Sequence, residues 1–135
     1  MTSLAVVGTD HLHVVDLVTK LSGAGAEVRV IVPSEDRIGP WLAKQFPDAR
    51  ADDPYDADID VVVTAAIPSE RAQIGIDAMR AGKNVVADKP GAISHEQLGA
   101  LRAAYAETGR KYTVIFAERL GSPAMMHAQR LVESG

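Results

Sequence analysis

The amino-acid sequence predicts an α/β domain in which helices cover both faces of a doubly wound parallel sheet, giving three layers. Short aliphatic runs alternate along the chain with segments whose apolar residues recur at helical spacing. The aliphatic runs lack polar alternation, which is typical of strands buried on both faces. The links are short, so right-handed crossovers are expected. The simplest layout is a Rossmann-type sheet with the strand order 3-2-1-4-5-6.

Each predicted strand ends where a turn residue interrupts an aliphatic run. Gly8 closes the first strand and Pro33 the second. The fourth begins after Gly82, a residue type that often ends a helix in the left-handed conformation. The predicted strands are 4–7, 28–32, 59–65, 84–87 and 112–117, with a short edge strand at 49–51.

The predicted helices are placed by their caps and apolar faces. Ser94 and Gln97 match a capping box, in which Gln97 reaches back to the cap. Ser122 followed by Pro123 is a typical cap and first-turn pair. The first helix is expected to have the apolar face Val14, Val15, Val18 and Leu21 and to end at Gly23 or Gly25. The second is expected to have Gly39 as its cap, Pro40 as its first residue and the apolar face Trp41, Leu42 and Phe46. The third begins at Pro68 with the face Ala72, Ile76 and Met79, and the fourth has the face Leu98, Leu101 and Tyr105 and ends at Gly109.

The composition is that of one aliphatic domain. The 135 residues are 47% hydrophobic and 4% aromatic, with a net charge of −4. The acidic balance, without a basic patch, argues against nucleic acid or an anionic membrane as a partner. The absence of cysteine fits a reducing compartment, the N-terminus lacks the features of a signal peptide, and the longest apolar window, 59–67, is too short to cross a bilayer. We therefore expect a cytoplasmic protein.

The turn Gly8-Thr9-Asp10-His11-Leu12-His13 follows the first strand, where a dinucleotide-binding fold holds a pyrophosphate. The full fingerprint has glycine at positions 8, 10 and 13, and only Gly8 is present. The amides from Asp10 to Leu12 can still face an anion at the helix start. Alternatively, Asp10 is an ordinary helix cap. Both interpretations stay open at this point.

The residue that would bind the adenosine ribose is also unusual. An acidic residue is expected about 20 positions after the turn, and Pro33 stands there. Ser34, Glu35 and Asp36 follow and could replace it. The choice between NAD and NADP is not readable from this segment.

No metal site is predicted. His11 and His13 are two residues apart, whereas ligands on one helix face are three or four apart. The run 56–60 resembles the start of a calcium loop but lacks the glycine and glutamate that complete one. His95 and His127 are expected on the surface.

Asp88-Lys89-Pro90 stands at the carboxyl end of the predicted strand 84–87, the edge at which open α/β sheets bind ligands. A lysine there can bind a phosphate or a hydroxyl, or exchange a proton. The alternative is a surface ion pair between Lys89 and Asp88. The chain has no cysteine and no Gly-x-Ser-x-Gly motif, so acyl transfer has no candidate nucleophile.

Ala81-Gly82-Lys83-Asn84-Val85-Val86, followed by Asp88-Lys89-Pro90, resembles the Ala-Gly-Lys-His-Val…Glu-Lys-Pro signature of the glucose–fructose oxidoreductase/inositol dehydrogenase (Gfo/Idh/MocA) family. Ala65-Ala66-Ile67-Pro68-Ser69 resembles the family's Ala-Thr-Pro-Asn loop beside the nicotinamide. Residues 119–123 and 131–135 resemble the segment that leads into the family's second domain.

The resemblance implies NAD(P)-dependent oxidation of a hydroxyl, often on a sugar or polyol. Lys89 would contact the reacting hydroxyl and assist proton transfer. Asp88, in place of the usual glutamate, would hold Lys89 and the nicotinamide ribose. The implied cofactor-binding residues are Gly8, Thr9, Asp10, His11, Leu12, Ser34, Ala65, Ala66, Pro68, Asp88 and Lys89.

The resemblance also implies a division into a nucleotide-binding domain, 1–120, and a helix, 121–135, leading to a second domain of roughly 200 residues. That domain would supply the substrate pocket, another catalytic residue and a dimer interface. Substrate binding is therefore expected only with it, and a homo-oligomer is also expected. The departures are Asp10 and His13 for glycines, Pro33 for the ribose acid, a shortened loop at 65–69, and Arg71 for a common histidine. These keep open a stand-alone, non-catalytic Rossmann module that senses a nucleotide or binds a protein.

Overall fold

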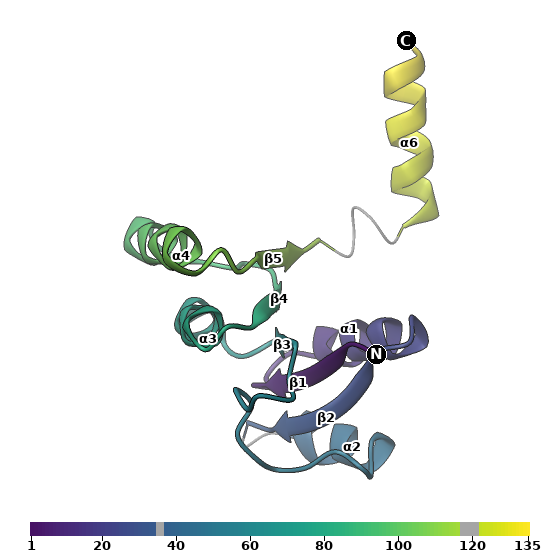
Figure 1. Ribbon diagram of the computed structural model, residues 1–135. Coiled ribbons are helices and arrows are strands. Elements are labelled where there is room, and N and C mark those ends of the chain that lie inside the picture. The colour runs from purple at the N-terminus through teal and green to yellow at the C-terminus, as the bar shows by residue number, and fades with distance from the viewer. Residues whose placement is uncertain (35–36, 117–121) are drawn as a thin grey trace.

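The computed structural model describes residues 1–34, 37–116 and 122–135, and within them five parallel strands alternate with helices (Figure 1). The strands are β1 (Ser3–Val7), β2 (Glu27–Val32), β3 (Val61–Thr64), β4 (Asn84–Asp88) and β5 (Tyr112–Ile115). The helices are α1 (His13–Gly23), α2 (Ile38–Gln45), α3 (Pro68–Arg80), α4 (His95–Thr108) and α6 (Pro123–Ser134). The end of the predicted strand 112–117, at Ala117, lies outside the described residues.

The sheet has the order β2-β1-β3-β4-β5, so the predicted six-strand order is one strand too long for the part of the chain described. The predicted edge strand 49–51 is reduced to a single parallel bridge, in which Arg50 pairs with Val30 of β2. This is the position that the predicted order gives to its third strand. The acidic segment that follows turns instead of pairing, because Asp52 and Asp53 accept hydrogen bonds from the amides of Asp53 and Tyr55.

Alternate residues of the interior strand β1 point to opposite faces of the sheet, and each face has its own core. Leu4 and Val6 pack in a cluster that includes Val14 of α1. Ala5 packs on the other face, in a cluster that includes Ile76 of α3. Strands buried on both faces and covered by helices on each side confirm the predicted three-layered, doubly wound fold.

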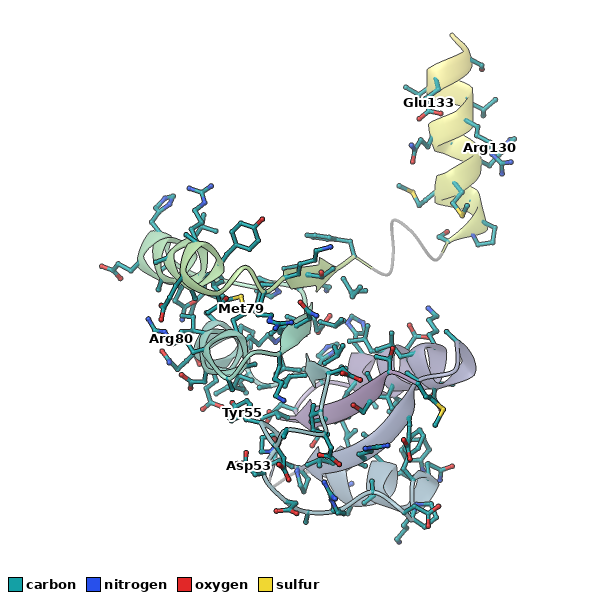
Figure 2. All side chains as sticks on the ribbon, viewed as in Figure 1. Asp53, Tyr55, Met79, Arg80, Arg130 and Glu133 are labelled. Carbon is teal, nitrogen blue, oxygen red and sulfur yellow. The ribbon has the colours of Figure 1, made fainter. Side chains whose placement is uncertain are left out.

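The face predicted for α3 is confirmed, since Ala72, Ile76 and Met79 are buried. Met79 lies on the inner side of the helix, whereas the neighbouring Arg80 lies on its outer side (Figure 2). Arg80 pairs there with Glu107 of α4, with 3.3 Å between Nε and Oε2. The two helices therefore contact through apolar residues inside and an exposed ion pair outside.

The faces predicted for α4 and α2 are partly wrong. In α4, Leu101 and Ala104 are buried, while Leu98 and Tyr105 are 39% and 57% exposed. Leu101 and Ala104 are three positions apart and share one face, and the small Ala104 lets α4 come close to the core. In α2, Trp41 is 48% exposed. Because the aromatic residues at helical spacing were counted as buried, the predicted buried faces were too wide.

The predicted caps are largely confirmed. Ser94 accepts a hydrogen bond from the amide of Gln97 at 3.1 Å, and Gly109 ends α4 with φ +67°. The Gln97 side chain accepts from the amide of Ile93 at 2.9 Å, one residue before the cap, so the box is shifted by one residue on that side. Ser122 caps α6 by accepting from Met125.

The first two helices begin and end close to the predicted residues. Gly23 is the last residue of α1. Helix α2 begins earlier than predicted, at Ile38, so Gly39 and Pro40 are its second and third residues. A Cβ atom on Gly39 would lie 2.3 Å from Cβ of Pro33, so glycine is needed for α2 to pack on the end of β2.

Among the described residues, no helix is long and apolar enough to cross a membrane.

Tyr112 of β5 makes stability sensitive to alkaline pH. Its hydroxyl donates to the carbonyl of Gly91 at 2.8 Å, and burial raises its pKa to about 12. Because the pKa in the folded state exceeds the ordinary value near 10, the contribution to stability is present below pH 10 and is lost as pH rises towards 12. We expect the melting temperature to fall over this interval, and to fall less in Tyr112→Phe than in wild type. The exposed Tyr105→Phe is the control; equal pH slopes for all three proteins would contradict the assignment.

Candidate functional site

The candidate site lies at the carboxyl edge of the sheet, where β1, β3 and β4 end beside one another. The parallel register pairs Val7 with Thr64 and Thr64 with Ala87, which brings the three strand ends to one level. The segments that leave them are 8–12, 65–68 and 88–90. Three of the four segments that the sequence assigned to cofactor binding therefore lie at one edge, and Ser34 is the fourth.

The turn after β1 packs directly on the loop after β3. Gly8 has φ +75°, and a Cβ atom there would lie 2.4 Å from Cβ and 2.8 Å from Cα of Ala66. The carbonyl of Gly8 accepts from the amide of Ala65 at 3.3 Å, and the amide of His11 donates to the carbonyl of Ala65 at 3.2 Å. Only glycine fits both the conformation and the space, so Gly8 sets the close approach of the two segments.

Several backbone amides of this turn are already hydrogen-bonded within the protein. Besides His11, the amide of Thr9 donates to Oγ of Ser34 at 3.0 Å, and the amide of His13 donates to Nδ1 of His11 at 3.2 Å. The amides of Asp10 and Leu12 remain as candidate donors to a pyrophosphate. The turn is thus tighter than the sequence interpretation assumed.

Asp10 does not cap α1, contrary to the alternative drawn from the sequence. The residue before α1 is Leu12, whose side chain makes no capping bond. The Asp10 carboxylate instead accepts from the hydroxyl of Ser34 at 2.6 Å. Ser34 thereby joins the segment after β2 to the turn after β1, which places it beside the predicted cofactor site. The other two candidates, Glu35 and Asp36, lie outside the described residues.

Asp88 is only 3% exposed, so the alternative of a surface ion pair with Lys89 is wrong. Its Oδ1 lies 2.9 Å from Nδ1 of His13, and its Oδ2 lies 3.6 Å from Nδ1 of His11 and 3.3 Å from Nη2 of Arg71. A buried carboxylate requires compensating partners. These three side chains supply them.

Arg71 is the site residue that sequence reasoning missed. It is 2% exposed, and besides Asp88 its guanidinium donates from Nε to the carbonyl of Ala66 at 2.6 Å and from Nη1 to the carbonyl of Lys89. One planar cation thus ties the loop after β3 to the end of β4. Its position one turn after Pro68, at the helix end that faces the ligand edge, was the available signal.

Lys89 is half-buried and follows Asp88 directly, with a cis peptide bond to Pro90. It borders a groove of about 910 Å³ that extends along α4 and β5. The large hydrophobic side chains of this groove that stay exposed are Ile93, Leu98, Tyr105 and Phe116. Lys89 thus lines an apolar groove and directly follows Asp88, which contacts the turn after β1.

A parallel doubly wound sheet with a glycine turn between its first strand and helix defines the nucleotide-binding class of Rossmann domains. Residues 5–116 match the GFO_IDH_MocA model, described as an oxidoreductase family with an NAD-binding Rossmann fold. The chain belongs to this family, and the matched residues form its NAD-binding domain. The resemblance inferred from Asp88-Lys89-Pro90 is confirmed.

Similar proteins are longer than this chain. Inositol 2-dehydrogenase 2 of Saccharopolyspora erythraea is 29% identical over 136 residues, which cover 96% of this chain and 38% of that protein. An Erwinia carotovora atroseptica protein of known crystal structure, named as an oxidoreductase, is 33% identical in sequence and superposes with a TM-score of 0.91. The match covers 100% of this chain and 42% of that protein. UDP-N-acetylglucosamine 3-dehydrogenase GnnA of Acidithiobacillus ferrooxidans, at 20% identity and a TM-score of 0.77, covers 96% of this chain and 43% of its own, and shares the fold.

Proposed function

We propose that this chain is the cofactor-binding part of an oxidoreductase that moves a hydride between NAD or NADP and a hydroxyl-bearing carbon of a sugar, polyol or related small molecule. The observation that carries the proposal is the meeting of Gly8, the loop 65–68 and Lys89 at one sheet edge. The relative named as an inositol dehydrogenase favours a polyol.

The residues present fit a dinucleotide. Gly8 leaves no space for a side chain, and the amides of Asp10 and Leu12 stand at the start of α1, where the helix dipole favours an anion. The bound cofactor would supply the hydride acceptor or donor. In the direction of oxidation, Lys89 would contact the substrate hydroxyl and assist the loss of its proton while the carbon gives up the hydride. Arg71 would act as a positioning residue, because it holds the carbonyl of Lys89.

A complete catalytic site would need residues beyond these 135. The surface next to Lys89 is lined by apolar side chains such as Ile93 and Phe116. A polyol is bound through hydrogen bonds to its hydroxyls, and an apolar wall leaves them unpaired. The greater length of the three similar proteins fits a further domain that supplies polar groups.

The test is a calorimetric titration of the purified chain with NAD⁺, NADH, NADP⁺ and NADPH. We expect weak binding of at least one of these cofactors, with a dissociation constant between roughly 0.1 and 1 mM, equivalent to about 4–5.5 kcal/mol. We also expect no turnover of inositol or other sugar alcohols by the chain alone. Turnover would contradict the need for further residues, and no binding at millimolar concentration would contradict the cofactor proposal.

A second candidate is a non-catalytic Rossmann module that senses a nucleotide or binds a protein partner. It is favoured by the internal hydrogen bonds of the Thr9, His11 and His13 amides, which reduce the donors available to a pyrophosphate. If the module binds a protein partner, dinucleotide binding is expected to be absent.

A further inference from the structure

Three side chains with metal-binding groups converge beside the cofactor turn. They are His11, His13 and Asp88, and one ligand atom from each lies within 4.8 Å of the others. Asp88 comes from the end of β4, whereas the histidines come from the turn before α1 and from its first residue. The fold thus brings together groups that are 75 residues apart in the chain.

The spacing of the two histidines does not prevent them from sharing a ligand. The rule of three or four residues applies within a helix, and α1 begins only at His13. His11 lies in the preceding turn, and its Nδ1 accepts from the amide of His13 at 3.2 Å. The two rings meet edge to face, with centroids 4.2 Å apart. Both rings can therefore face Asp88.

The separations of the donor atoms suit a small cation. Nδ1 of His13 lies 2.9 Å from one oxygen of Asp88, and Nδ1 of His11 lies 3.6 Å from the other. In a tetrahedral zinc site with bonds of about 2.0–2.1 Å, neighbouring ligand atoms are about 3.3–3.4 Å apart. The two observed distances lie on either side of this value, so small rotations of the side chains would form the site.

We propose that His11, His13 and Asp88 bind a divalent transition-metal ion such as Zn²⁺, with the remaining positions open to water or an anionic group. Imidazole and carboxylate ligands suit zinc and its first-row neighbours. Binding requires lone pairs on both Nδ1 atoms. The Nδ1 of His11 is unprotonated, because it accepts from the amide of His13, and the ion would displace that hydrogen bond; in His13 a proton on Nδ1 would move to Nε2 of the same neutral ring. The proposal does not depend on the assignment as an oxidoreductase.

The solvent exposure of the ligands and the neighbouring charge determine the expected affinity for a metal ion. The side chains of His11 and His13 are 50% and 31% exposed, so an ion can reach them from solvent. Arg71 lies 3.3 Å from Oδ2 of Asp88, and its positive charge opposes a cation at that oxygen. The other oxygen, which faces His13, is the better ligand. We expect a dissociation constant in the micromolar range, as for a partly exposed site.

The experiment uses the full 135-residue chain without a histidine tag. Zn²⁺ is titrated by calorimetry and Co²⁺ by visible absorption, which reports nitrogen and oxygen ligands directly. We expect one ion per chain, and an affinity at least about tenfold lower in His11→Ala and in His13→Ala. His95→Ala and His127→Ala, which remove the other two histidines of the chain, are the controls and should bind as wild type does.

Circular dichroism would show whether each variant is folded. The proposal is overturned if wild type binds no ion at 100-fold molar excess, or if binding survives in the His11→Ala/His13→Ala double variant. It is also overturned if the loss occurs in His95→Ala or His127→Ala, which would assign the ion to a surface histidine. In a folded Asp88→Asn variant, the neutral amide should weaken binding as well, and unchanged affinity would remove Asp88 from the ligand set.

Discussion

Arg71→Met is expected to destabilise the protein by about 3–5 kcal/mol, because it leaves the buried Asp88 carboxylate without its guanidinium partner. The same change also removes the donors to the carbonyls of Ala66 and Lys89. Urea unfolding monitored by circular dichroism measures the difference. Both the end of β4 and the loop after β3 should become less protected in hydrogen exchange.

Arg80→Met is the matched control on the same helix. Arg80 is exposed and its only described ion pair, with Glu107, is exposed as well, so we expect a cost below about 1 kcal/mol. Arg71→Lys should recover part of the stability. An ammonium group keeps the charge, but it lacks the planar set of N–H donors with which the guanidinium reaches all three acceptors. Equal costs for Arg71→Met and Arg80→Met would contradict the view that Arg71 organises the site.

Gly8→Ala is expected to abolish dinucleotide binding and to destabilise the protein by about 2–4 kcal/mol. The strain of a left-handed alanine contributes about 1–2 kcal/mol. The displacement of Ala66, whose Cα would lie 2.8 Å from the new methyl group, adds about 1–2 kcal/mol. Binding is lost because the shift separates the turn from the loop 65–68.

The control for this variant is Gly25→Ala. Gly25 has φ +94°, but nothing lies within 4 Å of a Cβ atom there, so only the conformational cost applies. It follows α1 at the opposite edge of the sheet and should leave cofactor binding unchanged. If Gly8→Ala binds cofactor as well as Gly25→Ala does, the turn after β1 is not the cofactor site.

The fold could be predicted because its information is local. Each strand contains a short run rich in aliphatic residues, and each helix has an apolar stripe or a capping residue within a few positions. The prediction of an edge strand at 49–51 was wrong for a local reason too. The aspartates that follow Arg50 accept hydrogen bonds from nearby amides, so this segment turns and does not pair with a neighbouring strand. The buried faces of the helices were harder to predict. Leu101 and Tyr105 both fit helical spacing, and only packing on the core distinguishes the buried residue from the exposed one.

The site could be predicted only by position. Strand ends indicated that Gly8, Ala65 and Lys89 lie at one edge, and the structure places them there. The side-chain partners could not be predicted, because they join distant parts of the chain. Ser34 contacts Asp10 across 24 residues, and His13 contacts Asp88 across 75 residues. A sequence pattern contains no signal for such pairs.

The central claim is that a dinucleotide binds at the carboxyl edge of β1, β3 and β4. An NMR titration of ¹⁵N-labelled protein with NAD⁺ and with NADP⁺ tests it residue by residue. We expect the largest amide shifts in 8–12, 65–69 and 88–91, with little change in α6 or at Gly25. Shifts confined to residues 93–116, which line the groove along α4 and β5, or no shifts at millimolar cofactor, would contradict the account.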